Sequence, residues 1–185
     1  MLWKILIVAA ALIVVFLIVV ALQPSTFRVV RTATIAAPPE AVFAQVNDFH
    51  KWAAWSPWEH KDPAMKRTYE GPAAGMGSVY KWAGNKDVGE GGMTIVDSRP
   101  SDLIRIRLEF LKPFAATNQT EFSFKPQGHQ TAVTWTMTGT NNFMGKLFCM
   151  FMDMDKLVGS DFEKGLAGMK SVVESQPAPA HAMAN

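Results

Sequence analysis

The stretch FRVVRTATIAAPPEAVF, residues 27–43, decides the fold of this chain. Its first ten residues are rich in β-branched side chains and alternate along the chain, with Val29 and Ile35 on one side and Thr32 on the other. This alternation predicts a strand over 27–36. Pro38-Pro39-Glu40 follows and predicts the start of a helix, because proline is tolerated in the first turn and an acidic residue suits a helix N-terminus.

A second short helix is predicted over 49–55, ended by Ser56-Pro57. Segments typical of strands follow, each bounded by glycine, proline or asparagine, at 66–70, 78–83, 91–98, 103–110, 116–125 and 131–140. Two of them alternate cleanly: Ile104 and Ile106 oppose Arg105, and Val133 and Trp135 oppose Thr134. We therefore expect an antiparallel sheet with one apolar face and one solvated face.

The last predicted element is one long helix over 142–174. Its apolar residues recur mostly every three or four positions, at Phe143, Leu147, Phe151, Met154, Val158, Phe162, Met169 and Val173. Gly159, Gly165 and Gly168 each lower helix propensity by about 1 kcal/mol, so they predict a kink or a close approach to the sheet. Such a helix has to cover the apolar face of a sheet that curls around it. The predicted fold class is therefore α+β.

The N-terminus carries an apolar run, because all eighteen residues from Ile5 to Leu22 are Ala, Val, Ile, Leu or Phe. As a helix this run spans roughly 27 Å, about the hydrocarbon thickness of a bilayer. We predict a single transmembrane anchor over 1–22; a cleavable signal peptide, with Lys4 as its basic flank, is the alternative. The cationic residues on the two sides of this run nearly balance, and we favour an extracytoplasmic domain.

The anchor leads into a predicted linker at 23–26, a folded domain at 27–174 and a disordered tail at 175–185. The chain has 185 residues and a net charge of +2 without a basic run, so we expect no nucleic-acid partner. Its single cysteine, Cys149, excludes a disulfide framework, and its four histidines show no metal-ligand spacing. We predict neither a metal nor a cofactor. The absence of a Gly-x-Ser-x-Gly motif disfavours a dedicated hydrolase.

The residues resemble those of the START-like superfamily, also called SRPBCC, which includes the polyketide cyclase/dehydrase-like and birch-pollen-allergen-like proteins. The resemblance covers roughly 28–174. It rests on IAAPPEAVF at 35–43, on VNDF at 46–49 followed by Trp52, on WSPW at 55–58, and on GMGSVY at 75–80 followed by Trp82. It implies a helix-grip fold, in which a curved antiparallel sheet wraps a long C-terminal helix around a hydrophobic cavity. Many members bind lipids, sterols or polyketides, and a minority are enzymes.

Aromatic side chains around an apolar interior are a common way to build a small-molecule site. The predicted ligand-binding residues are Trp52, Trp55, Tyr80, Trp82, Phe110, Phe122, Trp135, Phe151 and Met154. The same spacings also suit an ordinary filled core, so both interpretations stay open at this point.

Glu90 and Tyr80 are the candidates for acid–base chemistry, since a carboxylate beside an apolar cavity has a raised pKa. An exposed hairpin acid is the alternative interpretation for Glu90. We favour a membrane-tethered domain that binds a hydrophobic small molecule or lipid between the sheet and the C-terminal helix. The alternatives are a cyclase- or dehydratase-type enzyme on an apolar substrate and a non-enzymatic partner-binding module.

Overall fold

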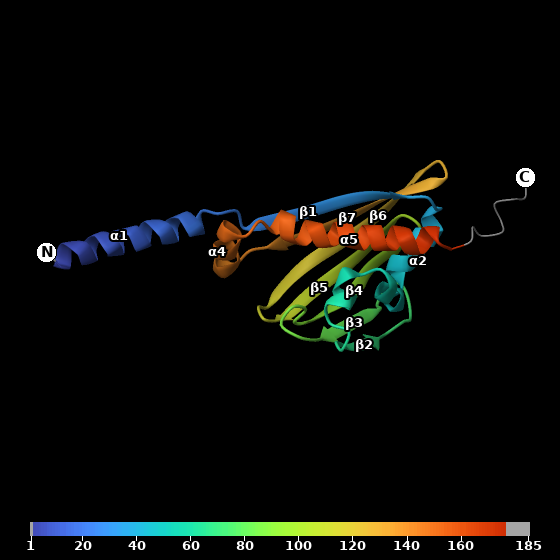
Figure 1. Ribbon diagram of the computed structural model, residues 1–185, viewed down its shortest axis with the longest axis horizontal. Helices are drawn as coiled ribbons and strands as arrows, with labels where there is room; N and C mark the ends of the chain where they lie inside the picture. Colours follow the sequence, from blue (N-terminus) through green and yellow to red (C-terminus); the bar gives the residue numbers. More distant parts are fainter. Residues whose placement is uncertain (1, 177–185) are drawn as a thin grey trace, which may run out of the picture.

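The computed structural model describes residues 2–176, in which a sheet curves around one long helix (Figure 1). The sheet has seven antiparallel strands in the order β1-β7-β6-β5-β4-β3-β2. The strands are β1 (Thr26–Ile35), β2 (Lys66–Glu70), β3 (Val79–Ala83), β4 (Glu90–Arg99), β5 (Leu103–Lys112), β6 (Ala116–Gln127) and β7 (Gln130–Thr140). The helices are α1 (Leu2–Ala21), α2 (Pro39–Asn47), η1 (Phe49–Ala54), α3 (Pro57–Lys61), α4 (Phe143–Phe151) and α5 (Met154–Glu174). This is the helix-grip architecture that the sequence predicts.

The inner face of the sheet is covered by helices that the chain supplies from two places. α5 lies along β1, whereas α2 contacts β5, β6 and β7. The alternation seen in the sequence holds, since Val133, Trp135 and Met137 of β7 are buried and the threonines between them are not. The hydrophobic core therefore sits between the inner sheet face and the helices, and the outer face is solvated.

The predicted single helix over 142–174 is wrong in one respect, because it is divided into α4 and α5. The chain leaves the helical conformation at Met152 and Asp153, and Asp153 caps α5 by accepting a hydrogen bond from the backbone N–H of Lys156 at 3.1 Å. Asn142 caps α4 in the same way, accepting from the N–H of Gly145. Aspartate favours a cap over a helix interior, because its short side chain competes for backbone N–H groups.

The glycines of α5 mark close approaches to the sheet and its loops, as the sequence predicts. A Cβ at Gly165 would stand 2.8 Å from the ring of Trp135, and one at Gly168 would stand 2.8 Å from the carbonyl oxygen of Trp55. At Gly159 the guanidinium of Arg31 occupies the space instead. The small residues let α5 lie near the sheet without a clash.

Arg31 fastens α5 to the first strand. Its guanidinium donates to the carboxylates of Asp155 at 2.9 Å and of Glu163 at 2.6 Å. These contacts raise the pKa of Arg31 above its ordinary value and hold the pKa of Asp155 below its own. A charge on the inner face of β1 is thus neutralised at the edge of the core.

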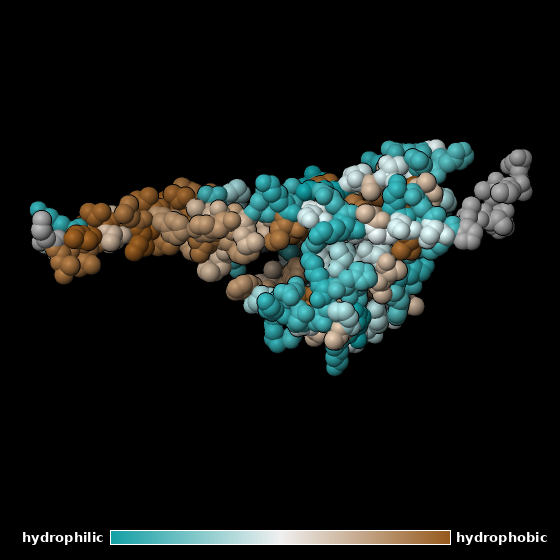
Figure 2. Space-filling model, in the orientation of Figure 1, coloured by the Kyte–Doolittle hydropathy of each residue, from teal (hydrophilic) through white to brown (hydrophobic). Residues whose placement is uncertain are grey.

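α1 extends away from the domain as an apolar helix (Figures 1 and 2). It is long and apolar enough to cross a membrane, a property that a signal sequence shares. All its described residues are exposed except Val20, and its C-terminal end contacts α4. Of the predicted tail over 175–185, residues 177–185 lie outside the described residues.

Candidate functional site

The deep part of the interior is filled by aromatic rings. Trp135 stacks on Phe162 of α5 with ring centroids 4.0 Å apart. The ring centroid of Phe122, on the neighbouring strand β6, lies 4.6 Å from that of Trp135. Trp52 and Trp55 approach these rings edge-on. Because the five side chains are buried and in mutual contact, this half of the interior is a packed core.

The end of the inner face nearest α1 is built differently. Strand pairing aligns one row of side chains across the whole sheet, which we call the inner row: Phe27, Gly139, Asn118, Leu108, Met93, Tyr80 and Tyr69. Phe27, Leu108 and Tyr69 in this row are only partly buried. The inner row therefore adjoins the packed core without being sealed by it.

Asn118 of β6 is the amide side chain of the inner row. It is 8% exposed, and its Oδ1 atom has no hydrogen-bond partner among residues 2–176. A Cβ at Gly139 would stand 2.2 Å from this oxygen, so the glycine makes room for the amide. The Nε1 atom of Trp135 is likewise buried without a partner in the described part of the chain. Most buried polar atoms in folded proteins have a hydrogen-bond partner, so these two atoms are exceptions that need an explanation.

A second row of aromatic side chains lies beside the inner row on the same face. Trp82 pairs across the sheet with Gly91, and Gly91 pairs with Phe110. A Cβ at Gly91 would stand 2.4 Å from the Trp82 ring, so the indole lies against the β4 backbone. Its Nε1 donates to the carbonyl oxygen of Val88 at 3.0 Å, which fixes the ring. Trp82 and Phe110 meet edge to face and remain partly buried.

The predicted ligand-binding residues divide between these regions. Trp52, Trp55, Tyr80, Phe122 and Trp135 belong to the buried core, whereas Trp82 and Phe110 are partly buried at the α1 end of the inner face. Met154 begins α5 and is half-buried. Phe151 is 74% exposed at the end of α4, because the break after it turns α4 away from the sheet.

A surface hollow of about 570 Å³ lies where α4 meets α5. Phe151, Met152 and Leu157 line its apolar side, and Lys61 of α3 lines its far side. Lys61 is held there by Asp161 at 2.7 Å and lies over the ring of Trp58. Figure 2 shows the surface hollowed below α4 and the start of α5.

Tyr80 takes part in a buried charge cluster. Its hydroxyl donates to Glu59 Oε1 at 2.5 Å, and Arg67 Nε donates to Glu59 Oε2 at 2.6 Å. Burial, followed by the hydrogen bond to Glu59, raises the pKa of Tyr80 well above its ordinary value. Tyr80 therefore keeps its proton, and the cluster joins α3 to β2 and β3.

Glu90, the other candidate for acid–base chemistry, lies on the opposite face of the sheet from Trp82. Its neighbour Gly91 lies under the Trp82 ring, and successive residues of a strand face opposite sides. Glu90 Oε1 accepts from Lys112 Nζ at 2.7 Å and its side chain is 34% exposed. This position gives Glu90 no contact with the interior.

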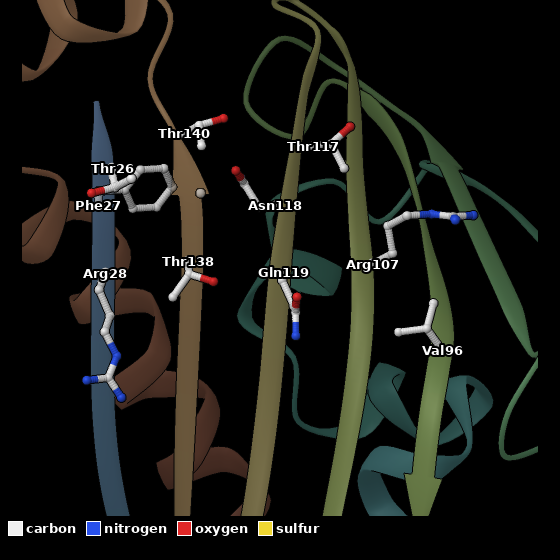
Figure 3. Close-up of a pocket in the computed structure, with 11 residues that line it drawn as sticks. Thr26, Phe27, Arg28, Val96, Arg107, Thr117, Asn118, Gln119, Thr138 and Thr140 are labelled. Carbon is white, nitrogen blue, oxygen red and sulfur yellow. The ribbon is translucent and has the colours of Figure 1, made fainter. Parts of the chain in front are cut away.

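The outer face carries a larger hollow, of about 860 Å³, that the sequence did not reveal (Figure 3). Strand pairing aligns Arg28, Thr138, Gln119 and Arg107 across it, and we call this the outer row. The two arginines flank the hollow three strands apart, or about 14 Å at backbone level. The alternation in the sequence identifies these residues as solvated, but only the cross-strand register aligns them. Among the described residues, no three metal-ligating side chains come together.

A family model described as "polyketide cyclase / dehydrase and lipid transport" matches residues 26–174. The chain belongs to this family. The match covers every element from β1 to α5 and leaves out α1, the residues that join it to β1, and the C-terminal residues. A comparison with curated protein sequences found no match.

Solved structures of low sequence identity share this fold. Protein CV1439 from Chromobacterium violaceum is 17% identical with a TM-score of 0.58, covering 83% of this chain and all of its own. Protein MLL2253 from Mesorhizobium loti is 12% identical with a TM-score of 0.60, and the match covers 82% of this chain and 99% of that protein. The Aha1 dimer from Colwellia psychrerythraea is 15% identical with a TM-score of 0.58, covering 80% and 97%. At these identities the likeness concerns the fold alone.

Proposed function

We propose that this protein is held at a membrane by α1 and binds an apolar small molecule or lipid at the α1 end of the inner sheet face. The observation that carries the proposal is the inner row, where partly buried apolar side chains lie beside a buried amide oxygen that has no hydrogen-bond partner among the described residues. Apolar walls with a few placed polar groups are typical of small-molecule sites. The description of the family as one of lipid transport supports the same ligand class.

In this proposal Leu108, Phe110 and Trp82 contact the apolar part of the ligand. Asn118 Oδ1 would accept a hydrogen bond from a hydroxyl, and the rings of the packed core would form the floor. Burying roughly 300 Å² of apolar ligand surface contributes about 7 kcal/mol before the entropy costs of binding. In this proposal the hollow beside the α4–α5 bend would be the entrance to the site.

The site is tested with a fatty acid that carries a photoreactive diazirine, added to membranes that contain the full chain. After illumination, residue-level mass spectrometry should locate adducts on Leu108 or Phe110. Leu108→Trp fills the inner site and should remove these adducts. Val96→Trp makes a matched change on the outer face and should leave them. Adducts confined to α1 and its surroundings would refute the binding site.

The tether and its orientation have separate tests. The mass of the intact protein recovered from cells reports whether α1 is retained; a chain that begins after Ala21 would identify α1 as a signal sequence. We also propose that the domain is extracytoplasmic. Protease added to spheroplasts of a bacterial host should then remove a tag placed at the C-terminus, and a protected tag would place the domain inside.

A further inference from the structure

The large exposed apolar side chains outside α1 gather at one end of the domain. Ten of them belong to segments at the α1 end of the domain, which are the residue after α1, the end of β5 and its following turn, α4, and the start of α5 (Figure 1): Leu22, Leu111, Phe114, Phe143, Met144, Phe148, Met150, Phe151, Met152 and Leu157. Elsewhere in residues 2–176 the large exposed hydrophobics are Met76 and Val96 alone. Single exposed apolar residues need no explanation, but a cluster of this kind marks an interaction surface.

α4 supplies five of these ten residues and presents them away from the protein. None of its residues is buried, and Met144, Phe148 and Phe151 are 60%, 46% and 74% exposed. At 100° per residue these three share one side of the helix with Phe143 and Leu147. A helix on the surface of a water-soluble domain has the opposite arrangement, with its apolar side toward the core.

The remaining side of α4 faces α1. Lys146 lies on this side, and its Nζ donates to the carbonyl oxygen of Ala21 at 2.8 Å. Val20, the buried residue of α1, immediately precedes Ala21, and α1 and α4 are in contact. In Figure 2 the apolar surface of α1 continues onto α4 without a hydrophilic break. α4 is thus fixed beside the last turn of α1.

The β5–β6 turn adds a second apolar point at the same end. Leu111 near the end of β5 and Phe114 in the turn are 63% and 74% exposed. The turn follows Phe110, which lies one row beyond Leu108 of the inner row, on the side where β1 begins. α4 and this turn both lie at the end of the domain from which α1 extends (Figure 1).

We propose that α4 and the β5–β6 turn form a second membrane contact, with their apolar side chains inserted in the interfacial layer of the bilayer. We call these two segments the apolar rim, and the inference rests on the proposed tether. The twenty residues of α1 span about 30 Å as a helix, so its C-terminal end reaches the depth of the lipid headgroups. A short helix with exposed phenylalanines at that depth lies in the interface, and a lysine there extends toward the headgroups.

The apolar rim has a consequence for the proposed ligand. A chain held only by α1 and the linker could swing freely, whereas two further contacts fix the domain with its hollowed end toward the lipid. The hollow at the α4–α5 bend, which Phe151 and Met152 line, would then open at the bilayer surface. An apolar molecule could enter the domain from the membrane without crossing water.

Spin labelling of the full chain in phosphatidylcholine–phosphatidylglycerol vesicles tests the rim. In a Cys149→Ser background, nitroxides are attached to single cysteines at four positions. Phe148→Cys and Phe114→Cys report on the rim, Val15→Cys reports on α1, and Ser171→Cys is the control on the exposed side of α5. The ratio of accessibility to oxygen over that to a water-soluble nickel chelate measures depth in the bilayer.

We expect the labels at 148 and 114 to show oxygen-to-nickel ratios several-fold above that at 171, and the label at 15 to show the highest ratio. A ratio at 148 equal to that at 171, with a high ratio at 15, would overturn the rim and leave the tether intact. Low ratios at both 148 and 15 would overturn the tether and the rim together. A label at 148 that is shielded from both reagents would mean that protein, such as a second copy of the chain, covers α4, and would also overturn the rim.

Discussion

Replacing Asn118 by leucine should make the protein more stable and a poorer binder. Leaving a buried carbonyl oxygen without a hydrogen bond costs about 1–3 kcal/mol, and leucine of similar size removes that cost. A volume-conserving exchange itself costs up to about 1.5 kcal/mol through imperfect fit, here against Gly139 and Phe27. We therefore expect the free energy of unfolding to rise by about 1 kcal/mol, which raises the Tm by about 2–4 °C for a domain of this size.

The assay is denaturation of the full chain in one detergent, after extraction of bound lipid, followed by the near-ultraviolet circular dichroism of its tryptophans. Gln119→Leu is the matched control, since this adjacent amide is exposed on the outer face and its loss should change stability by no more than about 0.5 kcal/mol. The same Asn118→Leu protein should capture less of the diazirine fatty acid. A destabilised variant, or a stabilised one with full capture, would refute the role assigned to the amide.

Three further changes test the packing around the site. The pKa values of Asp155 and Glu174 lie below the usual 3.8 and 4.5 because Arg31 and the Ala36 N–H donate to them. A carboxyl whose pKa is lower in the folded state stabilises the fold at pH values above its unfolded-state pKa, so the free energy of unfolding should fall as the pH drops below about 4.5. This fall should be less steep in Glu174→Gln. A pH dependence that is the same in both proteins, measured by urea titration, would contradict this. Tyr80→Phe should lower the free energy of unfolding by about 1–3 kcal/mol in a urea titration at pH 7, because the buried carboxylate of Glu59 loses a hydrogen-bond donor. An unchanged midpoint would show that water replaces the hydroxyl. Asp153→Ala should cost about 1 kcal/mol and speed hydrogen exchange in the first turn of α5, and unaltered exchange there would argue against the cap.

The fold could be read from the sequence because its signals are local and repeated. Alternation in 103–110 and 131–140, and proline in the first turn of α2, locate strands and helices to within one or two residues. The break at Met152–Asp153 was missed because apolar residues continue through it at helical spacing. The signal that could have located it is Asp153 itself, a residue that favours caps, immediately before a helix-forming stretch.

The site could be predicted only in part, because it depends on cross-strand register. Aromatic residues such as Trp82 and Trp135 have the same sequence pattern, yet one lies at the α1 end and the other in the packed core. Asn118 carries no sequence signal, since an amide in a strand of Thr, Asn and Gln reads as solvated surface. Asn118 is buried because it lies on the same face of β6 as Thr120 and Phe122. The polar residues around it in the chain hide this alternation.

Native mass spectrometry of the full chain, released from detergent after purification from membranes, tests most directly whether this protein binds an apolar ligand. The account predicts an adduct with the mass of a lipid or another apolar molecule on the wild-type chain, retained in Val96→Trp and lost in Leu108→Trp. A wild-type chain that is detected only at the mass of the unliganded protein, and that takes up no added lipid, would contradict the account.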